Sequence, residues 1–135
     1  VMGICVGMQI MAASSEEGEM PGLGWISARV KKFDVPTIEV KPKIPHMGWN
    51  IVRPTQPEHP MWEHLIQQQE APYFYYVHSY YPALANPEES ACTTTHGSQT
   101  FHGAITKGKL FATQFHPEKS QHAGLQLLRN FCALK

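Results

Sequence analysis

The sequence has 135 residues, the size of a single domain, and 42% of them are apolar against 16% charged, a balance typical of a globular protein with its own core. Eleven basic and eleven acidic side chains leave a formal net charge of zero, so we expect no nucleic-acid partner, because neutralising phosphates takes clustered basic charge. No apolar run approaches the ~18 residues of a membrane-spanning helix, so no membrane partner is expected either. The three cysteines lack the paired spacing of a disulfide framework or a zinc site, which favours a reducing, cytoplasmic location.

The first residues have the form of a nucleophile elbow, a sharp turn between a strand and a helix. Small residues at Gly3 and Gly7 let the backbone pass close to itself around Cys5. Only the first two residues are available for the strand before this turn, fewer than the ~5–6 residues of a typical strand. We therefore expect residues 1–135 to be the C-terminal part of a single larger domain.

The elements expected after the turn alternate between helix and strand. Residues 7–13 contain good helix formers and predict a helix, and the turn-rich stretch 14–24 predicts a loop. Residues 25–33 predict a strand, because apolar side chains alternate there with polar ones. A short strand is expected over 37–40, between prolines, and an apolar side over 58–69 predicts a short helix.

The second half is richer in strand signals. The aromatic run 72–81 predicts a strand, and 90–96 predicts another. Residues 99–106 and 110–115 predict a hairpin around a Lys-Gly turn. The clearest helix is expected over 119–134. Its expected apolar stripe consists of Leu125, Leu128 and Cys132, widened by Leu127, Phe131 and Leu134. Strands mixed with helices indicate an α/β or α+β fold.

Cys5 is the strongest candidate for chemistry. At the start of a helix, backbone N–H groups and the helix dipole favour a thiolate, which is the nucleophilic form of cysteine. The alternative is a small buried cysteine beside a tight turn. The pentapeptide alone does not decide between the two.

The second candidate is the run His116-Pro117-Glu118. Proline biases the residue before it to extended geometry, so His116 should end a strand. Side chains two apart in extended chain project to the same side, so Glu118 can reach the His116 ring and orient it. A solvated His and Glu at a strand end is the alternative. Together with an elbow cysteine, the pair completes a nucleophile, a base and a group that orients the base.

Other residues carry weaker signals. Cys92 and Cys132 are expected in the core, because free cysteine is among the most buried residue types. The seven further histidines lack HExxH or paired ligand spacing, so we expect no metal site. The aromatic run has no basic residues between its rings, which favours a buried strand over a surface for base stacking.

Several motifs, in this order along nearly the whole chain, carry a resemblance to a known family: GICVGMQ, SSEEG, GLGW, PHMGWN, YFYYVHSYY and TQFHPEKS. The cysteine elbow and HPE resemble the class I glutamine amidotransferases. PHMGWN and FHPEKS are more specific, and resemble the glutaminase subunits of imidazole glycerol phosphate synthase.

The resemblance implies an open α/β fold around a mostly parallel sheet and the hydrolysis of L-glutamine to glutamate and ammonia. It implies that Cys5 forms a glutamyl thioester, that His116 moves the protons and that Glu118 holds His116. The backbone N–H of Val6 would be one donor of the oxyanion hole. No cofactor is expected.

The same resemblance assigns residues to the substrate. By similarity, Gln9 helps to hold the substrate glutamine. His78, Ser79 and Tyr80 match the family segment that lines the amino-acid end of that glutamine.

The resemblance also implies a partner. The family passes its ammonia to a (β/α)8-barrel cyclase, which makes imidazole glycerol phosphate and an aminoimidazole carboxamide ribonucleotide. Trp49 and Lys119 match family positions near the interface with that cyclase. From the residues alone, Trp49 is equally consistent with a core aromatic and Lys119 with a solvated helix start.

One departure from the family pattern bears on activity. The family carries its second oxyanion donor on a glycine-rich loop that nothing in this sequence matches, so we expect this chain alone to be nearly inactive. Three alternatives stay open. The chain could be the glutaminase of another class I enzyme, such as one feeding GMP or carbamoyl phosphate synthesis, an inactive fragment or non-catalytic binding module, or a cysteine hydrolase of peptides or esters.

Overall fold

The computed structural model describes residues 1–18, 21–33, 46–66, 71–96 and 99–134. Its strands are β1 (Met2–Ile4), β2 (Ala12–Ser15), β3 (Ile26–Lys32), β4 (His46–Ile51), β5 (Arg53–Pro54), β6 (Tyr73–His78), β7 (Tyr80–Leu84), β8 (Ser90–His96), β9 (Gln99–Lys107) and β10 (Leu110–Thr113). Its helices are α1 (Val6–Gln9), α2 (Gln121–Ala133) and the 3-10 turns η1 (Pro60–Trp62), η2 (Pro87–Glu89) and η3 (Pro117–Lys119). The mixture confirms the expected α/β class. None of the described helices is long and apolar enough to cross a membrane.

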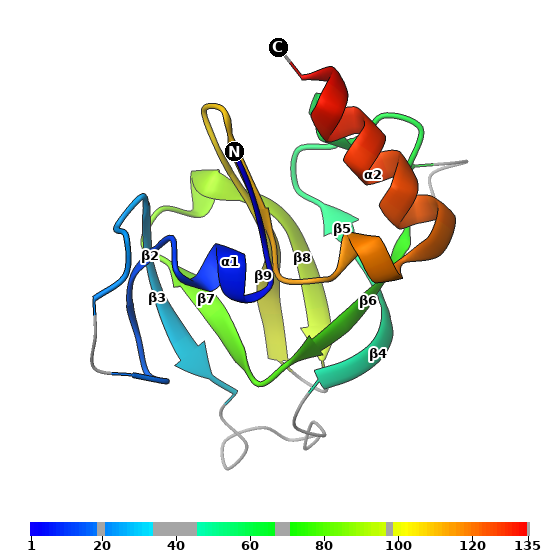
Figure 1. Ribbon diagram of the computed structural model, residues 1–135. Coiled ribbons are helices and arrows are strands. Elements are labelled where there is room, and N and C mark those ends of the chain that lie inside the picture. The colour runs from blue at the N-terminus through cyan, green and yellow to red at the C-terminus, as the bar shows by residue number, and fades with distance from the viewer. Residues whose placement is uncertain (19–20, 34–45, 67–70, 97–98, 135) are drawn as a thin grey trace.

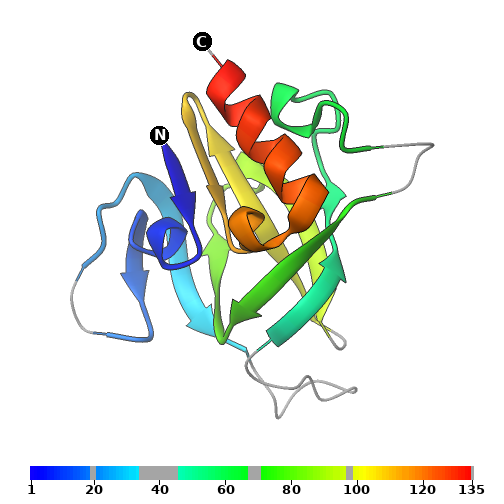
Figure 2. The same cartoon turned by 45° about the vertical axis from the view of Figure 1, so that its right-hand side comes forward.

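The strands form three sheets. The largest has the order β1-β10-β9-β8-β5, and the others are β2-β3-β7 and β4-β6. In Figures 1 and 2, β2, β3 and α1 lie on one side of the molecule, and β4, β6 and α2 lie on the other. Within the described residues, β1 with β10 and β2 with β3 pair in parallel, whereas the other five pairings are antiparallel. The expected mostly parallel sheet is therefore wrong for this part of the chain.

The predicted helix over 7–13 is shorter than expected. α1 ends at Gln9, and the chain continues as β2, parallel to β3. The reason is hydrogen bonding to a distant segment, because the carbonyls of Ile10 and Met11 accept from the N–H groups of Leu23 and Ile26 rather than from a further helical turn. β3 confirms the strand expected over 25–33, and its buried residues alternate as predicted. The strand expected over 37–40 lies outside the described residues.

The helix predicted over 58–69 is wrong for the residues that the structure describes there. Only the single turn η1 forms, although Trp62 and Leu65 are buried as an amphipathic helix would place them. The turn ends at Glu63, whose ψ is 132°, and His64 then adopts a φ of 65°, outside helical geometry. The prediction failed because the apolar pattern shows which side chains are buried but does not show that the backbone leaves helical geometry after one turn.

The aromatic run 72–81 forms two strands instead of one. β6 pairs with β4 and β7 pairs with β3, and the break falls at Ser79. β8, β9 and β10 confirm the other expected strands, and the hairpin turns at Gly108 with a φ of 58°. This break brings the backbone of the run beside the elbow.

α2 confirms the predicted helix, but its buried face is only partly the expected one, since Leu127 is buried as predicted and Phe131 packs against the core. Gly124, Leu127 and Asn130 face inward, whereas Leu125 and Cys132 are exposed. A Cβ at Gly124 would lie 1.7 Å from the Pro117 carbonyl oxygen, so the helix backbone packs directly on η3. The side-chain amide of Asn130 donates to the carbonyls of Met61 and Glu63, each at 2.8 Å. Small and polar contacts therefore add to the apolar contacts of Leu127, and the expectation that Cys132 lies in the core is wrong.

Candidate active site

The elbow forms as the sequence predicts. β1 leads into Cys5, which adopts φ 53° and ψ −109°, and α1 follows at once. A Cβ at Gly3 would lie 3.0 Å from the carbonyl carbon of Gly7, so the glycine permits the close crossing of the two segments. The Cys5 N–H donates to the Thr113 carbonyl at 2.7 Å and ties the turn to the end of β10.

The Cys5 thiol is half-buried and has polar neighbours. Its sulfur lies 3.8 Å from the Val77 carbonyl, and the side-chain amide of Gln114 donates to it at 3.6 Å. Burial raises the pKa of the Cys5 thiol, and the Val6 N–H and the Gln114 amide oppose this rise. The Val6 N–H at the start of α1 acts in the expected direction, but burial has the larger effect, so the pKa of the thiol is raised.

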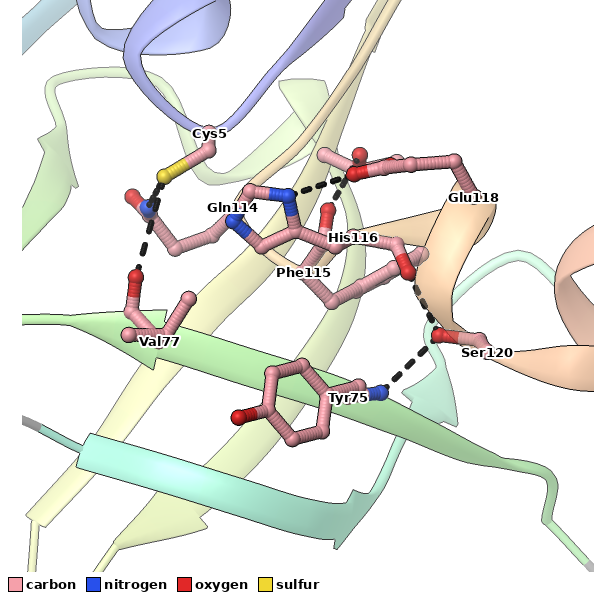
Figure 3. Close-up of polar contacts among 9 residues, drawn as sticks. Cys5, Tyr75, Val77, Gln114, Phe115, His116, Glu118 and Ser120 are labelled. Atoms are coloured by element: carbon pink, nitrogen blue, oxygen red, sulfur yellow. Dashed lines mark hydrogen bonds and ion pairs between the residues drawn. The ribbon is translucent and has the colours of Figure 1, made fainter.

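His116 and Glu118 are paired as the spacing predicts. Nδ1 of His116 lies 2.5 Å from Oε1 of Glu118. The other ring nitrogen, Nε2, is buried and has no hydrogen-bond partner among the described residues. Figure 3 shows this nitrogen turned away from Glu118, toward the side on which the Cys5 sulfur and the Gln114 amide lie. The ring is thus held on one side and left open on the side of the thiol.

Ser120 holds the loop that carries His116, and the sequence analysis did not find it. Its hydroxyl donates to the His116 carbonyl at 2.6 Å and accepts the Tyr75 N–H at 2.9 Å. The His116 N–H in turn donates to the Tyr75 carbonyl at 2.8 Å. These contacts fix the histidine loop against β6, and the two that Ser120 makes are drawn in Figure 3. The only signal in the sequence is a hydroxyl residue in the first turn of the helix predicted over 119–134.

Gln9 lies near Cys5, but its side chain contacts the protein. Nε2 of Gln9 donates to Oε1 of Gln114 at 3.0 Å and to the Tyr80 carbonyl at 3.4 Å. Ser79 and Tyr80 are partly exposed. The sequence analysis gave Gln114 no role, although a polar residue ending an apolar strand was a signal.

The His78 side chain is not available to a ligand. It is buried, with Nδ1 2.7 Å from the Tyr80 carbonyl and Nε2 3.0 Å from Nδ1 of His46. Nε2 of His46 lies 3.2 Å from the amide nitrogen of Asn50, which is a donor only. His46 must therefore carry its proton on Nδ1, and His78 must carry its own on Nδ1. The structure places the His78 ring in this chain of contacts, and only its backbone belongs to the segment beside Cys5.

Burial keeps these two histidines neutral. It lowers the pKa of His46 to about 3 and that of His78 to about 4. Neighbouring histidines lower both values further, whereas the hydrogen bond to the Tyr80 carbonyl opposes the shift at His78. Phe33 and Phe101 pack around both rings. The cluster fills the space between sheets, which is a structural role.

The two residues expected at a partner interface are both exposed. Trp49 is 48% exposed on β4, which argues against its being a core aromatic, and its ring contacts Tyr75 edge-on. Lys119 is exposed on η3, next to Glu118. Val6 is also exposed, and its N–H lies against the Cys5 sulfur.

Comparisons with known proteins agree on the family. The family model described as glutamine amidotransferase class-I matches residues 1–134. The imidazole glycerol phosphate synthase subunit HisH of a Cyanothece species is 52% identical over 96% of this chain, and that of Trichormus variabilis is 50% identical over 96%. The chain spans 59% of the length of each of these relatives.

The fold has a matching solved structure. The glutaminase domain of Trypanosoma brucei CTPS with bound acivicin superposes with a TM-score of 0.64 and 18% identity, over 99% of this chain and 60% of that one. At this identity the likeness concerns the fold alone. With the family match over almost every residue, the chain belongs to the class-I glutamine amidotransferase family.

Proposed function

We propose that the protein hydrolyses L-glutamine to glutamate and ammonia, with Cys5 as nucleophile, His116 as base and acid, and Glu118 as the group that orients His116. The observation that carries the proposal is the unpartnered Nε2 of His116, directed to the side of the Cys5 sulfur while Glu118 holds the opposite nitrogen. A nucleophile, a base and an orienting carboxylate in this order are the parts that acyl transfer needs.

In the first half of the reaction, His116 takes the thiol proton as the sulfur attacks the amide carbon of glutamine. A raised pKa of Cys5 makes this step necessary, because the resting sulfur keeps its proton until a base removes it. The amide oxygen becomes an oxyanion, for which the Val6 N–H is one donor. His116 then gives its proton to the nitrogen, the C–N bond breaks, and ammonia leaves a glutamyl thioester on Cys5.

In the second half, His116 takes a proton from water as the water oxygen attacks the thioester carbon. The C–S bond breaks, the proton returns to sulfur, and glutamate leaves. The Val77 carbonyl borders the sulfur, and Gln9, one helical turn from Cys5, donates to the Tyr80 carbonyl. Gln9 and the segment with Val77, Ser79 and Tyr80 are therefore the proposed contacts of the substrate. The His78 side chain is excluded from this set by its burial.

We further propose that the ammonia passes to a cyclase partner, a (β/α)8 barrel that makes imidazole glycerol phosphate, in the cytoplasm. The identity of about half the residues to relatives named as subunits of that synthase supports this choice. Exposed Met47 and Trp49 on β4 lie near the site, since Tyr75 contacts the Trp49 ring and also bonds to His116. These residues and Lys119 are the proposed interface.

The test is a glutaminase assay with and without the cyclase, using the protein with all its residues. We expect the cyclase of the histidine pathway to raise glutamine hydrolysis and to receive the ammonia, and Trp49→Ala to weaken that coupling. Stimulation by a GMP or carbamoyl phosphate synthase partner instead would assign the chain to another class I enzyme. Ester or peptide hydrolysis without glutamine hydrolysis would refute the proposal.

A further inference from the structure

Gln114 is a buried polar residue that the proposed reaction does not use. It lies directly after β10, is fully buried, and is held by its backbone N–H, which donates to the Gly103 carbonyl at 2.8 Å. Its side-chain amide lies between two residues of the site. Oε1 accepts from Gln9 at 3.0 Å, and Nε2 donates to the Cys5 sulfur at 3.6 Å.

The orientation of this amide is determined by its neighbours. Nε2 of Gln9 can only donate, and the two atoms it reaches, Oε1 of Gln114 and the Tyr80 carbonyl, can only accept. A reversed Gln114 amide would set two NH2 groups against each other and would turn a carbonyl oxygen toward the sulfur. The NH2 group of Gln114 must therefore face Cys5.

We propose that Gln114 is a positioning residue for the nucleophile: its amide N–H holds the Cys5 sulfur in place and stabilises the thiolate, and Gln9 keeps that amide in the orientation required. The inference rests on the proposed function only in taking Cys5 as the attacking group. Its effect on the thiol itself is measurable without glutamine.

Burial and nearby carboxylates disfavour ionisation of the Cys5 thiol, so a hydrogen-bond donor at the sulfur is needed to oppose them. Burial raises the pKa of Cys5, and the carboxylates of Glu118, from the loop after β10, and Glu17, from the segment after β2, raise it further. The Val6 N–H and the Gln114 amide lower it. The other titratable group on this side is His116, whose Nε2 is turned toward the thiol. Gln114 is thus a neutral side chain that, with the Val6 N–H, opposes the effect of burial without adding a charge.

The experiment is the pH dependence of Cys5 alkylation by iodoacetamide, followed on the Cys5 peptide by mass spectrometry. The thiolate displaces iodide, so the rate reports the ionised fraction of the thiol. All variants carry Cys132→Ser, because Cys132 is exposed and would react as well. Gln114→Met keeps the volume of the side chain and removes the donor. We expect alkylation below the thiol pKa to be about three- to tenfold slower, with the rate at high pH, where the thiol is fully ionised, almost unchanged.

Two further variants keep the test decisive. Gln126→Met removes a similar half-buried amide whose partner is Asn130, on α2, and should leave the Cys5 profile unchanged. Gln9→Met removes the group that orients Gln114, so it should shift the pH profile of Cys5 alkylation in the same direction by a smaller amount. It replaces Gln114→Met in the test if that variant does not fold. An unshifted profile in either folded variant would overturn the role of Gln114. A shifted profile in a protein that never hydrolyses glutamine would uphold that role and count against the proposed function instead.

Discussion

Two hydrogen-bonded pairs in the structure, His116 with Glu118 and His46 with His78, differ in the groups that surround their rings. His116 is paired with the carboxylate of Glu118 and keeps one ring nitrogen without a partner among the described residues. His46 and His78 are paired with each other, and their outer nitrogens contact an amide and a carbonyl. The comparison shows that matching a family motif does not by itself leave a histidine ring free to contact substrate or transfer a proton. A carboxylate on one side and a free nitrogen on the other equip His116 for proton transfer, whereas His78 has neither.

The first prediction tests whether His116 transfers protons in the reaction. Replacing His116 by Asn should lower glutamine hydrolysis by about 10²- to 10⁴-fold, the usual contribution of a general acid–base group. Steady-state kinetics on the protein with its partner measure this effect.

The matched control is His46→Gln, which replaces a histidine of the buried His46–His78 pair. It should change the turnover of the folded protein far less. Equal losses of turnover in the two variants would remove the distinction between the pairs.

The second prediction concerns acid. His46 and His78 have a lowered pKa when folded but the ordinary value of 6.5 when unfolded. The unfolded chain therefore binds more protons below pH 6.5, so stability is complete at neutral pH and falls as the pH drops, until the folded rings protonate near pH 3 to 4. We expect about 2 kcal/mol of unfolding free energy to be lost per histidine between pH 7 and pH 5.

Urea unfolding at the two pH values measures this loss. His46→Gln removes one titrating ring, so its loss between pH 7 and pH 5 should be smaller than that of the parent chain by about 2 kcal/mol. His122→Gln, on the exposed start of α2, should behave as the parent does. If His46→Gln and His122→Gln have the same pH dependence, the buried pair is not the source of the acid sensitivity.

The third prediction tests the elbow. Gly3→Ala should destabilise the chain by about 1–3 kcal/mol, because its Cβ would lie 2.7 Å from the Met11 side chain and 3.0 Å from Gly7 backbone atoms that cannot move aside. Gly7→Ala adds a Cβ that meets nothing within 4 Å in the described part of the chain, and should be neutral or slightly stabilising. Denaturant midpoints of the two variants give the difference. A Gly3→Ala chain as stable as Gly7→Ala would show that the turn does not need the close crossing.

The parts of the site that sequence reasoning found are local. The elbow around Cys5 and the spacing of His116 and Glu118 involve residues only a few positions apart, so sterics and strand geometry predict them directly. The strand of alternating residues 26–32 and the hairpin at Gly108 were predicted for the same reason.

The parts that it missed depend on contacts between distant segments. Gln114 meets Cys5 across 109 positions, and Asn130 of α2 bonds to Met61 across 69, which no local pattern reports. The buried face of α2 was predicted only in part, because Gly124 contacts backbone, whereas hydrophobic periodicity counts only apolar side chains such as Leu127.

The most direct measurement of the central claim is the capture of the covalent intermediate. The protein, with the proposed cyclase partner, is quenched in acid during glutamine turnover, and its peptides are analysed by mass spectrometry. We predict a glutamyl thioester on Cys5, lost in Cys5→Ala and still present in the Cys132→Ser control. An adduct on another residue, or glutamine turnover that persists in Cys5→Ala, would contradict the assignment of Cys5 as the nucleophile.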